Sequence, residues 1–239
     1  PTTVRTVCGA AACFFRCRTV KEPDRMAASP EPAVYSADDI RTRVAGGALR
    51  SDTEAVGDHT FNPEIIGKFM EIERRPAAVL IPIVRHEPGA TVLFTQRTDN
   101  LSSHPGQVAF PGGKIDETDI SVEAAALREA EEEIGLRVQD VEIIGRAPEY
   151  LTGSGFHIAP VLGLVERDAR FTLNEYEVSD IFEVPLAFLM DPVNHSTGSR
   201  VWKGVRRTYY EMHYEGRYIW GVTAGMVRIL YERLYGDSA

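Results

Sequence analysis

Three glutamates near the middle of the chain have the type and spacing that a metal site needs. Glu129, Glu132 and Glu133 stand at positions i, i+3 and i+4. In a helix, where each residue advances by about 100°, these side chains fall within an arc of roughly 100° and should converge. Clustered negative charges destabilise a bare helix, whereas Mg²⁺ takes oxygen ligands and also binds substrate phosphates. The spacing therefore predicts a site for a divalent metal and a phosphate group.

An acidic run is more often a solvated helix face than a site, so its context matters. Here an apolar stripe of helical period lies beside the acids, formed by Val122, Ala126, Leu127, Ala130 and Ile134. Ser121 is a plausible N-cap and Gly135 a plausible residue just past the helix end. We therefore expect a helix from about 121 to 135 that holds the acids at the edge of the core.

Two glycines before this helix complete the local pattern. The sequence FPGG, residues 110–113, is a turn in which paired glycines allow positive φ and close backbone approach. Together with REAEEEIGL at 128–136, it resembles the motif of the Nudix hydrolase family. The family motif runs glycine, five residues, glutamate, seven residues, then Arg-Glu-apolar-any-Glu-Glu-any-Gly-apolar. The second half matches completely, but Asp119 replaces the first glutamate and the loop is one residue longer.

A second stretch, LFTQRTDNLSSHPGQVAFPGG at 93–113, resembles the additional motif of the coenzyme A branch of that family. The resemblance is carried by Leu93, Thr95, Arg97, Gly106, Phe110, Pro111, Gly112 and Gly113. Ser102 stands where the pattern often has arginine, so a basic group from elsewhere would have to contact the substrate. The longer loop is also a feature of this branch. The two departures therefore point in opposite directions.

The resemblance implies a fold, a cofactor and a set of site residues. The fold is α/β, a Nudix-type α/β/α sandwich with a mixed β-sheet, and the cofactor is Mg²⁺ or Mn²⁺. Glu129 and Glu133 are expected metal ligands, and Glu132 is a ligand or the general base. Arg128 is expected to orient a carboxylate or the glycine turn, whereas Glu131 should face solvent.

Other residues are candidates for binding or base catalysis. Nudix enzymes often carry a further glutamate on a later loop, and NEYEVSDIFEVPL offers Glu175 and Glu177, of which we favour Glu177 as base or extra ligand over a plain loop residue. His104 is a candidate for gripping substrate or an ordinary turn residue. Expected substrate contacts are Arg97, Gly112, Gly113, Lys114 and His104.

Composition limits the classes of function. The chain has 239 residues, 44% of them hydrophobic, with a formal net charge of -9. One sizeable domain with a buried core is the economical interpretation. The acidic balance disfavours a nucleic-acid surface, and an anionic substrate would need the metal together with Arg97, Lys114 and Arg128. No apolar run is long enough to span a membrane, so we expect a cytoplasmic protein.

The N-terminal region differs from the rest. All three cysteines lie there, at Cys8, Cys13 and Cys17, which argues against a disulfide framework and a cysteine nucleophile in the domain. Met26 resembles an ordinary protein start. We therefore expect residues 1–25 to be a disordered or non-native extension, 26–72 an N-terminal helical segment and linker, and 73–239 the Nudix domain.

Apolar periodicity and turn signals predict the remaining elements. We expect a capped helix at 36–49, a loop at 51–63, strands at 77–84 and 91–96, and strands at 141–147 and 156–165. Pro82 suggests an edge or a bulge in the first strand. A strand and a short helix are expected in 182–190, a late hairpin at 205–210 and 217–220, and an amphipathic helix at 223–235.

Three functions compete. The favoured one is a metal-dependent diphosphatase that cleaves coenzyme A or acyl-coenzyme A to 3′,5′-ADP and 4′-phosphopantetheine or its acylated form. The second is a Nudix diphosphatase for another nucleoside diphosphate compound, such as an ADP-sugar or a dinucleotide. The third is a catalytically silent ligand sensor. Late aromatics could stack an adenine, pack in the core or form a homodimer interface; they are Trp202, Tyr209, Tyr210, Tyr214, Tyr218 and Trp220.

Overall fold

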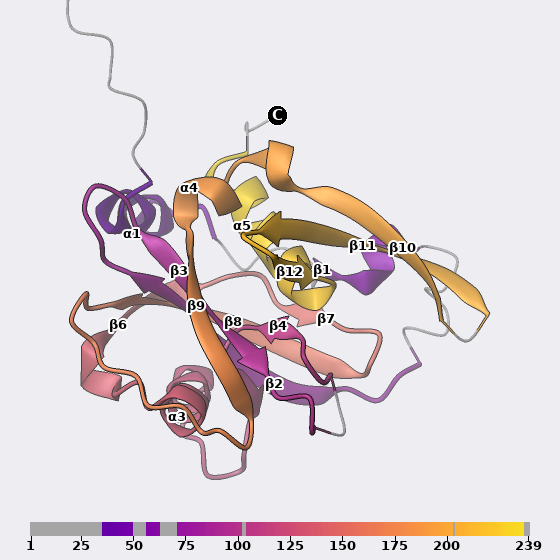
Figure 1. Ribbon diagram of the computed structural model, residues 1–239, viewed down its shortest axis with the longest axis horizontal. Coiled ribbons are helices and arrows are strands. Elements are labelled where there is room, and N and C mark those ends of the chain that lie inside the picture. The colour runs from indigo at the N-terminus through magenta and orange to yellow at the C-terminus, as the bar shows by residue number, and fades with distance from the viewer. Residues whose placement is uncertain (1–34, 50–55, 63–70, 102–103, 203, 237–239) are drawn as a thin grey trace, which may run out of the picture. The chain divides into compact units, whose positions relative to one another are not determined.

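The computed structural model describes residues 35–49, 56–62, 71–101, 104–202 and 204–236 (Figure 1). By its contacts the chain divides into Pro1–Pro32 and Ala33–Ala239, and all described residues belong to the second unit. The predicted extension at 1–25 lies outside the described residues and stays a prediction.

A large mixed sheet is the framework of this unit. In the described residues it has nine strands: β1 (Val56–Gly57), β2 (Arg75–Val84), β3 (Thr91–Arg97), β4 (Val108–Ala109), β5 (Gly112–Lys114), β6 (Val141–Arg146), β7 (Tyr150–Leu151), β8 (Phe156–Val165) and β9 (Val178–Pro185). The main path runs β1-β7-β8-β2-β3-β4, while β5 pairs with β2, β6 with β8, and β9 with β3. The pairs β2–β8 and β1–β7 are parallel and the others antiparallel. The predicted α/β fold with a mixed sheet is confirmed.

Strands β2 and β8 lie at the centre of the sheet, where both faces of the sheet are covered. Their register is continuous from Arg75 opposite Phe156 to Val84 opposite Val165. The last eight residues of each strand are buried, as expected for apolar runs in a parallel pair. The core divides into two clusters. One packs under α3 (Val122–Ile134), and the other packs against α5 (Val222–Leu234), α1 (Ala37–Ala45) and α4 (Leu186–Leu189).

The edge position suggested by Pro82 is wrong, because β2 is paired on both sides. Pro82 lies opposite Gly163 within the uninterrupted parallel ladder. On its other side, β2 pairs with β5 at Ala77–Val79 and with β3 only at Ile83–Val84. The backbone N–H of Leu80 points to that side, where it bonds Pro111 O, and residue 82 points the same way. Pro82 therefore lacks its N–H at a position where neither β5 nor β3 pairs with β2.

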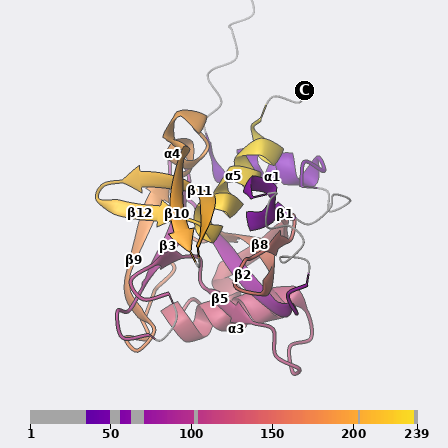
Figure 2. The same ribbon diagram turned by 90° about the vertical axis from the view of Figure 1, so that its right-hand side faces the viewer.

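A second, three-stranded sheet follows, made of β10 (Ser196–Trp202), β11 (Val205–Tyr214) and β12 (Arg217–Trp220). The predicted hairpin is confirmed, although β11 is longer than expected and β10 was not predicted. Figure 2 shows this sheet and α5 on the opposite side of the large sheet from α3.

Several other boundaries differ from the predictions. The expected loop at 51–63 contains β1 and a 3₁₀ turn, Asp58–Phe61, and β9 begins at Val178, four residues before the expected 182. Helix α1 follows its N-cap Ser36, whose hydroxyl accepts from the N–H of Asp39, and contacts β6 and α5. None of the helices in the described ranges is long and apolar enough to cross a membrane.

Candidate active site

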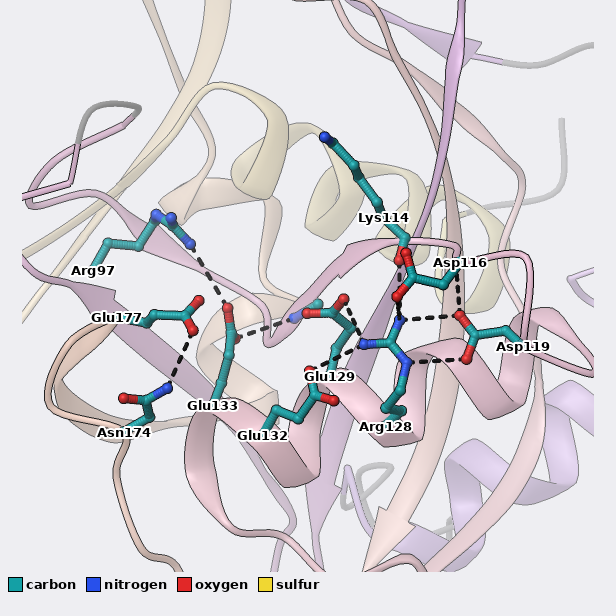
Figure 3. A network of polar contacts seen from close by, with 11 residues as sticks. Arg97, Lys114, Asp116, Asp119, Arg128, Glu129, Glu132, Glu133, Asn174 and Glu177 are labelled. Carbon is teal, nitrogen blue, oxygen red and sulfur yellow. Dashed lines mark hydrogen bonds and ion pairs between the residues drawn. The ribbon is translucent and has the colours of Figure 1, made fainter.

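Helix α3 carries the acidic residues, and its ends lie where the sequence predicts. The Ser121 side chain accepts from the N–H of Ala124, and Gly135 ends the helix in the left-handed region at φ 67°. Ala126, Ala130 and Ile134 are buried under the sheet. This packing leaves Glu129 and Glu133 on the flank of the helix that faces the paired glycines of β5 (Figure 3).

Glu133 is the most buried of the acids, at 3% exposure. Its carboxylate accepts from the N–H of Gly112 at 3.2 Å, and the Arg97 guanidinium lies 3.7 Å away. Burial raises the pKa of Glu133 to about 8, against the opposing effects of Gly112 and Arg97. The Glu129 and Glu177 charges add to the increase. The side chain is thus held at a place where an added cation would strongly favour its ionised form.

Glu129 is half-buried beside it. Burial raises the pKa of Glu129, while the Arg128 guanidinium at 3.0 Å opposes that increase. The charges of Glu132 and Glu177 raise it further. The carboxylates of Glu129, Glu132 and Glu177 therefore lie close enough to repel one another, which a bound cation would relieve.

Arg128 connects the helix to the loop before it. One guanidinium nitrogen lies 3.0 Å from both Glu129 and Glu132, and the other donates to Lys114 O at 3.1 Å. Asp116 is a more distant partner at 3.7 Å. Arg128 therefore contacts both the carboxylates and the backbone beside the paired glycines, the two alternatives for its orienting role.

Asp119, which departs from the family motif, is the strongest partner of Arg128. Two guanidinium nitrogens donate to its two oxygens, each at 3.0 Å, and the N–H of Asp116 donates to it as well. The Arg128 hydrogen bonds hold the pKa of Asp119 below its usual value. A shorter side chain on a longer loop thus still reaches the arginine in a bidentate pair.

Glu132 is the most exposed of the three glutamates. Its side chain is 57% exposed and pairs with the same Arg128 nitrogen that contacts Glu129, as Figure 3 shows. Glu131 is exposed, as expected. In the described part of the chain no three acidic, histidine or cysteine side chains are already grouped closely enough to hold a metal ion. The described residues therefore hold no preformed three-ligand site, and the metal-binding roles of the three glutamates stay predictions.

Glu177 takes the place beside Glu129 and Glu133. It comes from the loop before β9, and its carboxylate faces Glu133 in Figure 3. Asn174 holds it there by donating to Glu177 at 3.1 Å, and the N–H of Asn174 donates to Glu133 O at 2.9 Å. Glu175, the other candidate, is exposed. The sequence analysis missed Asn174, although it begins the same NEYEV segment.

The two glycines of β5 are required by close contacts. A Cβ on Gly112 would collide with Ala78 O, and one on Gly113 would lie 2.5 Å from the Glu129 carboxylate. Gly113 pairs with Ala78 in the sheet. The glycines therefore let β5 pair with β2 while the carboxylate rests directly on the backbone.

We expect Gly113→Ala to lower kcat about 100-fold without unfolding the protein. The new methyl group would displace the carboxylate of Glu129. Because that side chain is flexible, we expect the displacement to lower kcat and not the stability of the fold. Steady-state kinetics and a thermal melt would check this. Gly89→Ala is the control, because its Cβ would meet only Tyr35 O, at an ordinary 3.6 Å; equal kcat in both variants would contradict the assignment.

Two expected substrate contacts lie away from the carboxylates. The Lys114 side chain is exposed and points away from the cluster in Figure 3. His104 is exposed in the turn between β3 and β4, with its ring 2.9 Å from Gln107, which matches the turn-residue alternative. Ser102 lies outside the described residues.

Comparisons with known proteins agree with this geometry. The NUDIX domain model matches residues 74–190. A protein from Escherichia coli O7:K1 (strain IAI39 / ExPEC), named "Uncharacterized Nudix hydrolase NudL", is 44% identical over 160 residues, which cover 66% of this chain and 82% of that protein. A NudL from Shigella boydii serotype 4 (strain Sb227) has the same identity and coverage.

Solved structures resemble the chain more distantly. The Nudix hydrolase RenU from M. smegmatis has 24% identity and a TM-score of 0.42, covering 48% of this chain and 73% of that one. The Nudix domain of Shewanella oneidensis NrtR, complexed with ADP-ribose, has 22% identity and a TM-score of 0.39, covering 54% and 86%. With 44% identity across most of a curated relative, and with the acidic helix, arginine and paired glycines assembled as described, this chain belongs to the Nudix hydrolase family.

Proposed function

We propose that this Nudix hydrolase cleaves the diphosphate linkage of coenzyme A or acyl-coenzyme A, releasing 3′,5′-ADP and 4′-phosphopantetheine or its acylated form. The observation that carries the proposal is the path of residues 93–113. This coenzyme A-like stretch starts in β3 and ends in β5, and it supplies Arg97 and Gly112 to the same carboxylate, that of Glu133.

Arg97 is suited to an anionic substrate. Its guanidinium contacts Glu133 only at 3.7 Å, and its buried Nε has no hydrogen-bond partner among the described residues. A buried donor without a partner is costly unless a ligand satisfies it. The phosphate oxygens of a diphosphate would do so and would balance the surrounding acids.

The donors present fit Mg²⁺ or Mn²⁺. Glu129 and Glu133 present carboxylate oxygens, the ligands that these hard cations prefer, and burial, aided by the neighbouring carboxylate charges, raises the pKa of both. When bound, such an ion neutralises charge on the phosphoryl oxygens and activates water. Gly112 and Arg97 hold Glu133 in place, and Arg128 holds Glu129.

We assign the general base to Glu177 in preference to Glu132. Glu177 faces the buried carboxylates and is oriented by Asn174. Glu132 is largely exposed and already paired with Arg128 at 3.0 Å. A base must lie within hydrogen-bond reach of the attacking water, which favours the residue that faces the cluster.

Ser102 supports a second candidate, hydrolysis of another nucleoside diphosphate compound. It replaces the arginine of the coenzyme A motif, so a contact specific to that substrate is missing from the sequence.

A panel of substrates tests the choice. With Mn²⁺ or Mg²⁺, we expect kcat/KM for coenzyme A to exceed that for NADH and ADP-ribose by at least about tenfold, a difference of about 1.4 kcal/mol. A preference for either of the other two compounds would establish the second candidate. Absence of turnover of all three would favour a silent sensor and would overturn the proposal.

A further inference from the structure

A groove lies between the end of the β11–β12 hairpin and the turn that joins β3 to β4. It has a volume of about 350 Å³, within the range of small-molecule sites. Gln96 and Gly106 line one side, and Glu215, Arg217, Tyr218 and Trp220 line the other. The catalytic assignment uses none of these residues.

The hairpin wall of the groove is aromatic and fixed in position. The rings of Tyr218 and Trp220 are nearly parallel, at 11° and 5.9 Å between centroids. His213 stacks on Tyr218 at 4.8 Å, and Tyr209 packs against Trp220 at 5.2 Å. The Tyr218 hydroxyl donates to Glu211 at 2.5 Å, yet the residue stays 36% exposed. Such a row of rings offers stacking and edge contacts to a flat heterocycle.

The charge around the groove is net negative, which disfavours a phosphate group there. Arg217 pairs with Asp180 of β9 at 2.5 Å and lies over the Phe182 ring at 4.5 Å. Glu215 adds a carboxylate. The Gln96 amide nitrogen donates to Gly106 O, which fixes its orientation. Hydrogen-bonding groups beside aromatic rings suit an uncharged base with donors and acceptors on its edge.

The groove and the acidic cluster lie at the same end of β3. Gln96 lines the groove, whereas the next residue, Arg97, reaches Glu133 on the α3 side, because successive strand residues point to opposite faces. β9 spans the same two regions, since Asp180 holds Arg217 and Glu177 lies just before the strand. Strand β12 contacts β4, and Figure 2 shows β12 across the large sheet from α3.

We propose that this groove binds the purine base of the nucleotide substrate while the diphosphate lies at Glu129, Glu133 and Glu177. This inference rests on the proposed diphosphatase function and deepens it, because it assigns one half of the substrate to a place. A flat, uncharged base fits the ring row and the acidic surroundings better than a flexible pantetheine arm or a phosphate group.

Tryptophan fluorescence tests base binding directly. The chain has two tryptophans, Trp202 and Trp220, so Trp202→Phe leaves Trp220 as the reporter. With EDTA present, we expect AMP to quench its emission saturably and ribose 5-phosphate, which lacks the base, to leave it unchanged. Equal responses to the two ligands, or no response to AMP, would overturn the proposal.

Variants of the groove give the second measurement. In the Trp202→Phe protein we expect Tyr218→Ala to weaken AMP binding about tenfold, while Val201→Ala, exposed on β10 of the same sheet, leaves it unchanged. In the protein that retains Trp202, Tyr218→Ala should raise KM for the nucleotide substrate about tenfold and leave kcat unchanged. An unchanged affinity and KM in a folded Tyr218→Ala protein would contradict the assignment.

The outcomes separate this inference from the proposed function. Quenching by AMP without hydrolysis of coenzyme A would refute the substrate and leave the base site standing. Hydrolysis of coenzyme A without quenching by AMP would refute the base site and leave the proposed substrate standing.

Discussion

Glu133→Gln is expected to lower kcat by at least about 100- to 1000-fold while the protein stays folded. Glutamine keeps the volume and can still accept the hydrogen bond from Gly112, but it removes the charge 3.7 Å from Arg97. Burial already raises the pKa of Glu133 to about 8, so a neutral side chain at this place relieves desolvation. Without metal, the stability of Glu133→Gln should therefore equal or exceed that of the native protein, and only turnover should fall.

Glu131→Gln is the matched control. It makes the same chemical change two residues earlier on α3, at an exposed position, and should change kcat less than twofold. Thermal melts with and without Mn²⁺ separate binding from chemistry: the native protein and Glu131→Gln should gain stability with Mn²⁺, and Glu133→Gln should gain little. Near-normal turnover in Glu133→Gln would refute its role as a ligand.

Helix α3 could be predicted because its signals are local. Its N-cap Ser121, its apolar stripe and Gly135 all lie within one short segment, and each acts over a few residues. The close backbone approach at Gly112 and Gly113 could be predicted for the same reason, although both glycines lie in strand β5 and not in a turn. It was harder to predict which carboxylates meet, because i, i+3 and i+4 spacing fixes only the direction in which each side chain leaves the helix axis.

Glu132 and Glu177 show the limit of that spacing. Glu132 lies within the predicted arc but turns to Arg128, whose guanidinium is drawn to the loop by Asp119. Glu177, distant in sequence, reaches the cluster because Asn174 bonds the backbone of Glu133. The first outcome is an i,i+4 pair on the helix, whereas the second depends on a contact between segments distant in sequence, which no local pattern encodes.

The position of Pro82 and strand β10 of the second sheet were missed for related reasons. Proline in a strand usually indicates an edge. Here, however, β5 ends and β3 begins around residue 82, so the absence of an N–H on Pro82 costs the sheet no hydrogen bond. Strand β10, STGSRVW, has weak strand signals and is defined by its pairing with β11. Pairing across a sheet decides such segments more than propensity does.

Arg128→Lys should lower both stability and activity, although charge is kept. Lysine cannot make the bidentate pair with Asp119 while also contacting Glu129, Glu132 and Lys114 O. Because the arginine is only 27% exposed and pairs with both oxygens of Asp119, we expect a clearly lower Tm than that of the native protein.

Activity should fall at least about tenfold in Arg128→Lys, because Glu129 loses the contact that positions it. Arg137→Lys is the control: Arg137 forms a similar pair with Asp140 just past the same helix, but it is 57% exposed, so the change should lower Tm much less and leave kcat unchanged. Thermal melts and kinetics of both variants would check this. Equal effects would mean that Arg128 contributes charge alone, whereas the expected difference would show that its planar geometry holds the loop, Asp119 and the catalytic helix together.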